Sequence, residues 1–85
     1  MSKMEIRAAL ERIQSAPPMS PMIVLSSGHD NYVECAFANT VEAHRIAVCK
    51  PANFIGVFDG TMDLDDIAKL IKERVKADYL AARNR

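Results

Sequence analysis

The sequence predicts an α+β fold. We expect a small sheet of three strands, or four with one ambiguous segment, and an N-terminal, a short middle and a long C-terminal helix packed mainly on one face. Both ends of the chain have the periodicity of amphipathic helices, and three short apolar segments between them are typical of strands. With 85 residues the chain is expected to form a single domain, residues 1–85.

The first helix is expected over residues 3–15. Ser2 and Glu5 have the spacing of a capping box, in which two side chains satisfy backbone N–H groups at the start of a helix. At about 100° per residue, the apolar side chains between Ile6 and Ile13 share one face. A Pro-Pro pair then ends the helix because neither proline can donate a hydrogen bond, and residues 16–21 form an extended connector.

A β-hairpin is expected over residues 22–38. Its first strand, Met22–Ser26, is almost continuously apolar, which is typical of a strand covered on both faces. The second strand, Tyr32–Ala38, alternates, so that every other side chain faces the core. The polar residues 27–31 between them contain a glycine and form the turn.

Residues 40–49 allow two interpretations. Asn39 and Glu42 have the spacing of the first capping positions of a short helix, whereas the alternation that a strand requires is irregular here. We favour the helix, and the strand interpretation would supply the fourth strand of the sheet. A further strand is expected at residues 54–58, followed by an Asp-Gly turn.

The last helix is expected over residues 64–82. Asp63 can cap it, and Asp65 and Asp66 lie in its first turn, where the helix dipole favours acidic side chains. Its apolar positions recur at helical spacing and define the face that packs on the sheet.

A basic ridge lies on the opposite side of this last helix. Its four members fall within an arc of about 60°, and they are Lys69, Lys72, Lys76 and Arg83. Such a ridge can bind an acidic protein surface or phosphates, although a solvated face gives the same pattern. Leu70 and Leu80 lie outside the apolar face, and a second copy of the chain is the simplest cover for them. We therefore expect self-association through these two leucines.

Two cysteines and two histidines are the residues with potential for metal binding or nucleophilic chemistry: His29, Cys35, His44 and Cys49. Their spacings match no structural zinc motif. Cys35 lies in the middle of a strand on its apolar side, where burial raises the pKa of a thiol. We expect no catalytic residue, no metal and no cofactor, and a small enzyme or metal site around Cys49 and His44 is the weakest alternative.

The charge balance restricts the function. The chain has 11 Lys and Arg and 11 Asp and Glu. This net charge of zero excludes the broad basic surface of a general nucleic-acid binder. No apolar run approaches the ~18 residues that cross a bilayer, so no membrane contact is expected. We expect a cytoplasmic, non-enzymatic homodimer that binds another protein. Its small size suggests, by analogy, an inhibitory or accessory factor of phage or mobile-element type.

Nucleic-acid binding through the basic ridge is the main alternative. If residues 40–49 form a strand, the order of elements resembles the plan of a double-stranded-RNA-binding domain. That resemblance implies that the C-terminal helix contacts phosphates. The turn at residues 59–63 departs from the family, because acidic Asp59 and Asp63 stand where the family has a Lys-rich helix start.

Overall fold

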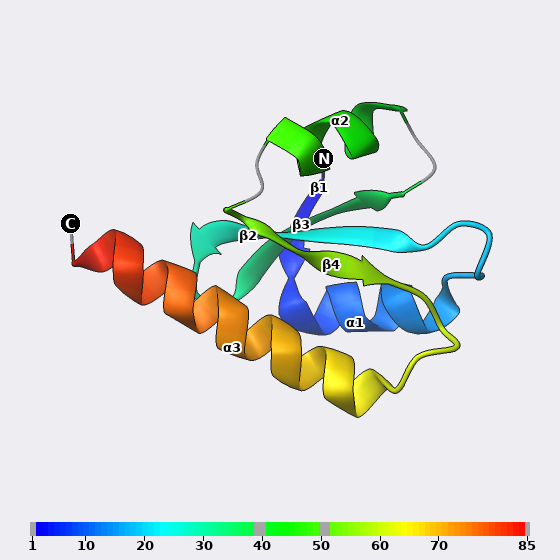
Figure 1. The fold of residues 1–85 in the computed structure, drawn as a ribbon. Helices are drawn as coiled ribbons and strands as arrows, with labels where there is room; N and C mark the ends of the chain where they lie inside the picture. The colour runs from blue at the N-terminus through cyan, green and yellow to red at the C-terminus, as the bar shows by residue number, and fades with distance from the viewer. Residues whose placement is uncertain (1, 39–40, 50–51, 85) are drawn as a thin grey trace.

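The computed structural model describes residues 2–38, 41–49 and 52–84 and confirms the α+β class. Its antiparallel sheet has four strands in the order β1-β3-β2-β4 (Figure 1). The elements in chain order are β1 (Ser2–Glu5), α1 (Ile6–Ser15), β2 (Met22–His29), β3 (Tyr32–Phe37), α2 (Val41–Cys49), β4 (Phe54–Phe58) and α3 (Leu64–Arg83).

The N-terminal residues form a strand where the sequence predicted the first turn of a helix. In β1, Ser2 lies opposite Cys35 and Glu5 lies opposite Tyr32 of β3. Helix α1 begins only at Ile6, and its N-cap residue Glu5 has extended backbone angles and makes no side-chain capping bond. The capping-box prediction is therefore wrong. Pairing with β3 satisfies the backbone groups of Ser2 and Met4 through a partner distant in sequence, and it overrides the local helix signal.

The β2–β3 hairpin is present, but its turn is shorter than predicted. Strand β2 continues to His29, so only Asp30 and Asn31 separate the two strands. The register shifts between Ser26 and His29, and Gly28 has a φ of 78° within this irregular stretch. Glycine adopts positive φ without steric cost, so it permits the bulge that lengthens β2 beyond the predicted end.

Residues 41–49 form helix α2, which decides between the two interpretations of this segment in favour of the helix. Strands β3 and β4 are both antiparallel to β2 and therefore run parallel to each other, so a crossover must connect them. Helix α2 provides it. The predicted cap at Asn39 lies outside the described residues. With a helix here and a strand at the N-terminus, the plan of a double-stranded-RNA-binding domain is wrong for this chain.

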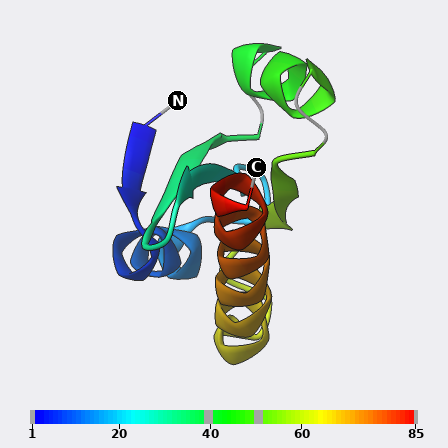
Figure 2. The ribbon, with the colours of Figure 1, turned by 90° about the vertical axis from the view of Figure 1, so that its left-hand side faces the viewer.

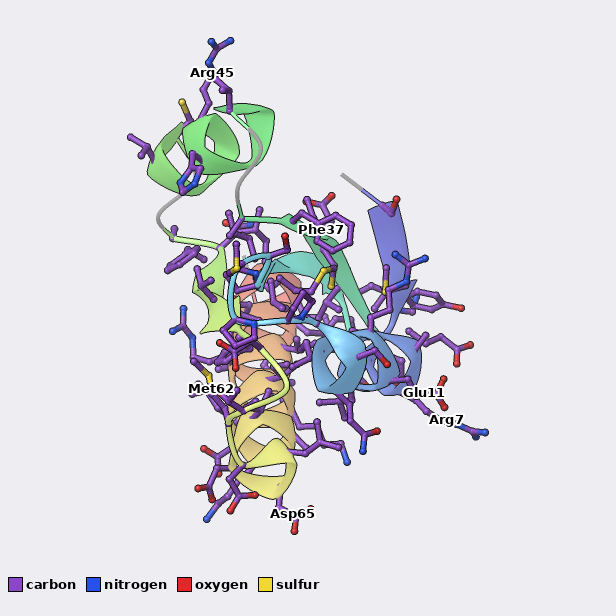
Figure 3. All side chains as sticks on the ribbon, turned by 90° about the vertical axis from the view of Figure 1, so that its right-hand side faces the viewer. Arg7, Glu11, Phe37, Arg45, Met62 and Asp65 are labelled. Carbon is purple, nitrogen blue, oxygen red and sulfur yellow. The ribbon has the colours of Figure 1, made fainter. Side chains whose placement is uncertain are left out.

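The helices divide between the two faces of the sheet. Helices α1 and α3 lie side by side beneath one face, and α2 lies alone on the other (Figure 2). The larger core packs between α1, α3 and the sheet, and the smaller one comprises Ile23, Leu25 and Ala38. On the outer side of α2, Arg45 points away from the sheet (Figure 3). The prediction that the helices pack mainly on one face of the sheet therefore holds for α1 and α3 but not for α2.

The turn before α3 is fixed to the end of α1. Gly60 N donates to the Ala16 carbonyl at 2.9 Å, and Asp59 Oδ1 accepts from the N–H and the hydroxyl of Thr61. These two hydrogen bonds lower the pKa of Asp59. Asp63 caps α3 as predicted, since its Oδ1 accepts from Asp65 N at 2.9 Å. The turn thus sets the position of α3 against α1.

Candidate cleft between α1 and α3

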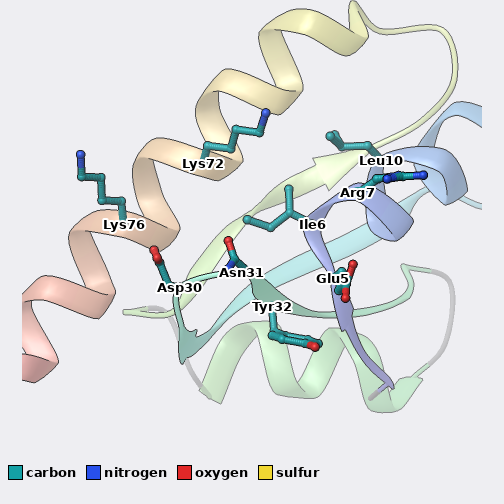
Figure 4. Close-up of a pocket in the computed structure, with 9 residues that line it drawn as sticks. All are labelled: Glu5, Ile6, Arg7, Leu10, Asp30, Asn31, Tyr32, Lys72 and Lys76. Atoms are coloured by element: carbon teal, nitrogen blue, oxygen red, sulfur yellow. The ribbon is translucent and has the colours of Figure 1, made fainter.

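A cleft lies between α1 and α3, at the tip of the β2–β3 hairpin (Figure 4). It has a volume of about 620 Å³. Three segments that are distant in sequence build it: the β1–α1 junction, the hairpin tip and the middle of α3. The junction is held to the hairpin because Ile6 N donates to the Asn31 carbonyl at 3.0 Å.

The cleft combines an apolar strip with charged side chains. Ile6 and Leu10 on α1 supply the apolar strip. Lys72 and Lys76 lie one helical turn apart on α3, and Figure 4 shows them across the cleft from Arg7. Three cationic side chains and an apolar strip suit a ligand that carries both acidic and apolar groups.

The opposite charge is present too. Glu5 at the end of β1 and Asp30 at the hairpin tip also line the cleft. Asn31 adds a neutral hydrogen-bonding side chain, and Tyr32 completes the lining at the hairpin tip. This set of side chains can hold a ligand by ion pairs and hydrogen bonds, and its two signs of charge favour one orientation of that ligand.

The structure divides the predicted basic ridge. Lys72 and Lys76 line the cleft, whereas Lys69 is exposed outside it. Arg83 lies near the C-terminal end of α3, with its guanidinium carbon 6.0 Å from the centroid of the Tyr79 ring. The pair in the cleft is therefore the part of the ridge that a ligand meets together with other recognition groups.

Leu70 and Leu80 are exposed, as the helical spacing predicts, at 40% and 44%. They lie about 15 Å apart along the axis of α3, at 1.5 Å per residue. At about 100° per residue they also point in directions roughly 80° apart. Both leucines therefore lie on one broad side of α3, and self-association through them stays a prediction.

The cysteines and histidines stand in three separate places. Cys35 is buried in β3, at 2% exposure, and His44 and Cys49 are exposed on α2. His29 lies at the hairpin tip, its ring edge-on to that of Tyr32 at 4.8 Å between centroids. Within residues 2–38, 41–49 and 52–84, no three or more His, Cys, Asp or Glu side chains gather as metal ligands would.

One serine lies beside a carboxylate where α3 packs on β2. Ser26 Oγ donates to Asp78 Oδ2 at 2.6 Å, and the serine is only 2% exposed. Both side chains line a small pocket of about 210 Å³ between the end of β2 and the C-terminal half of α3. The hydrogen bond joins the C-terminal half of α3 to β2, and it satisfies a polar group that would otherwise be costly to bury.

The buried thiol gives the protein a pH dependence at high pH. Burial raises the pKa of Cys35 from 9.0 to about 11, against a smaller opposing effect of the Arg12 charge. Between these values the unfolded chain has lost the thiol proton and the folded chain retains it, so the free energy of unfolding falls as the pH rises. We expect Cys35→Ala to flatten this fall in urea titrations between pH 9 and 11. Equal slopes for both proteins would contradict the assignment.

Sequence reasoning missed the residues of the cleft that come from the N-terminal segment. The helix prediction places Glu5 in a capping box and Arg7 on the solvated side, and it gives Tyr32 an ordinary strand position. No local signal marks these residues, because only the pairing of β1 with β3 brings them beside α3.

Comparisons with known proteins identify no relative of this chain. No described helix has both the length and the apolar character that a membrane crossing requires. No protein-family model matches the chain, and neither a curated protein nor a solved structure is similar to it.

Proposed function

We propose that this chain is a non-enzymatic interaction domain that binds an acidic segment of another protein in the cleft between α1 and α3. One observation carries the proposal: Lys72 and Lys76, the paired part of the basic ridge, line the same cleft as apolar Ile6 and Leu10. Lysines beside an apolar strip complement a peptide whose acidic and apolar residues alternate.

The acidic side chains of the cleft favour a protein partner over a nucleic acid. Glu5 and Asp30 repel a polyanion, in which every repeat carries negative charge. A peptide can instead place a basic or neutral residue beside them. The net charge of zero supports the same choice, since no broad basic field attracts nucleic acid.

Self-association, a cytoplasmic location and an inhibitory or accessory role of phage type complete the proposal. Self-association is supported by large apolar side chains that remain exposed on the single chain, among them Val41 at 75% and Val48 at 79%. The role rests on analogy with other small free-standing domains.

Charge reversal in the cleft tests the binding function. A library of fluorescent acidic peptides is titrated with the protein, and the tightest binder is measured again with Lys72→Glu/Lys76→Glu. We expect the dissociation constant to rise about tenfold or more, because both ion-pairing groups become repulsive. Lys69→Glu is the matched control, since it makes the same charge change on the same helix outside the cleft.

Three results would contradict the proposal: no acidic peptide binding, an equal loss with Lys69→Glu, or unchanged binding by the double variant. Duplex and single-stranded nucleic acids are measured in parallel over a salt series. Affinity for either that falls steeply with salt and is lost with Lys72→Glu/Lys76→Glu would favour the nucleic-acid alternative instead.

A further inference from the structure

Strand β1 leaves one edge of the sheet open. It is the outermost strand in the order β1-β3-β2-β4, and no described strand lies outside it (Figure 2). Ile6 N bonds to the carbonyl of Asn31, the residue opposite it in the register. Backbone groups alternate in direction along an antiparallel ladder, so the N–H and C=O of Lys3 and the N–H of Glu5 point outward, away from β3. The Glu5 carbonyl, at the N-cap of α1, already accepts the first hydrogen bond of that helix.

The opposite edge of the sheet is partly closed. On β4, the Phe54 carbonyl accepts a hydrogen bond of 3.2 Å from Arg74 Nη2 of α3. Within the described residues, no bond of this kind from a side chain or loop reaches the outward N–H and C=O of Lys3 or the N–H of Glu5. The β1 edge therefore offers two donors and one acceptor to a further strand.

The charges on β1 select the strand that fits this edge. Lys3 and Glu5 are two positions apart, so both side chains stand on the same face of the sheet, and both are exposed. A second β1 strand running antiparallel and centred on Met4 places each Lys3 opposite Glu5 of the second copy. The same register aligns each Glu5 N–H with the Lys3 carbonyl of the other copy, which gives two hydrogen bonds and two ion pairs.

Other registers fail on charge or on backbone. A twofold axis at Lys3 sets lysine against lysine, and one at Glu5 sets glutamate against glutamate. A twofold axis that passes between two consecutive residues places a residue with outward-facing backbone groups opposite one whose backbone already bonds to β3. Charged residues on an edge strand usually disfavour pairing with another strand. Here they disfavour only strands that lack the complementary pattern of charges.

We propose that two copies of this chain join along β1, centred on Met4, and form one continuous eight-stranded sheet. This inference rests on the proposed self-association and assigns its interface to β1 in place of Leu70 and Leu80. The twofold axis sets the two Met4 side chains against each other on the side of the sheet that carries α1. The interface is short, so the dimer dissociates as the protein is diluted.

Charge exchange tests the register. By sedimentation analysis over a concentration series, Lys3→Glu and Glu5→Lys should each raise the dimer dissociation constant about tenfold or more, because both symmetry-related pairs become repulsive. A mixture of the two variants should form a heterodimer, since the two acidic side chains on one β1 strand then face two lysines on the other. The double variant K3E/E5K should recover the homodimer.

Cross-linking tests the position of the axis. In a Cys49→Ser background, Met4→Cys should form an intermolecular disulfide with oxidised glutathione, because residues at this kind of pair lie about 4.5 Å apart between Cα atoms. Ser2→Cys is the matched control. Its two copies would lie about 13 Å apart at about 3.3 Å per residue, too far for a disulfide.

The outcomes separate the two proposals. A monomer at high micromolar concentration would overturn self-association together with this interface. A dimer that ignores both charge reversals, or that cross-links equally through Ser2→Cys, would overturn the β1 interface alone. Peptide binding through Lys72 and Lys76 is measured independently, so its failure leaves this inference standing.

Discussion

Replacing Gly60 by alanine is expected to lower the free energy of unfolding by about 3 kcal/mol or more. A Cβ at this position would lie 2.4 Å from the Gln14 carbonyl oxygen and 3.2 Å from that of Ala16. Both are backbone atoms at the end of α1, so neither can turn aside as a side chain does. The alanine must push the turn away from α1 and weaken the bond from Gly60 N to the Ala16 carbonyl.

Urea denaturation monitored by circular dichroism measures the free energy of unfolding of this variant. Two other glycines provide the controls. At Gly56 the added Cβ meets a Phe58 ring carbon at 2.6 Å, and a ring can shift, so the loss should be smaller. At Gly28 no atom lies within 4 Å, and the φ of 78° alone costs about 1 kcal/mol. A loss at Gly60 no larger than that at Gly28 would show that the turn is not held against α1.

The second large effect is expected at Ile71, where alanine should cost about 3–4 kcal/mol. The side chain is fully buried, at 0% exposure, within the core between α3, α1 and the sheet. Removing it deletes apolar contacts and leaves a cavity that the surrounding helices and strands fill only in part. A domain of this size has a total stability of only about 5–10 kcal/mol, so a large fraction would be lost.

Leu70 is the matched control, since it is adjacent on the same helix and 40% exposed. Leu70→Ala should cost less than about 1 kcal/mol, because most of its surface is already in water. Thermal unfolding of both variants makes the comparison. Similar losses at the two positions would mean that α3 docks on the sheet in another rotation.

The C-terminal half of the fold could be predicted from local signals. Asp63 caps α3 by its own side chain, and the residues of β4 span the predicted range. Strand β1 could not be predicted in this way. Its four residues carry the local signature of a helix start, and they become a strand only by pairing with residues 32–35, far along the chain.

Only one part of the candidate site could be predicted from the sequence, and it is the part that lies on a regular helix. Lys72 and Lys76 are found by helical spacing, because α3 is regular over its whole length. Arg7 and Tyr32 are not, since their places beside α3 depend on the β1–β3 register. The exposure of Leu70 and Leu80 was predicted from helical spacing and is confirmed, whereas self-association through them stays a prediction.

The strand order also fixes how the sheet can assemble. The two central strands are neighbours in sequence and close a short hairpin, whereas Ser2 must find Cys35 across more than a third of the chain. The other outer strand, β4, pairs with β2 across a similar separation. Long loops close late and open early, so both outer strands join after the hairpin, and β1 opens more readily than the hairpin does. A second copy bound there would hold it in place, and the midpoint of unfolding would then rise with protein concentration.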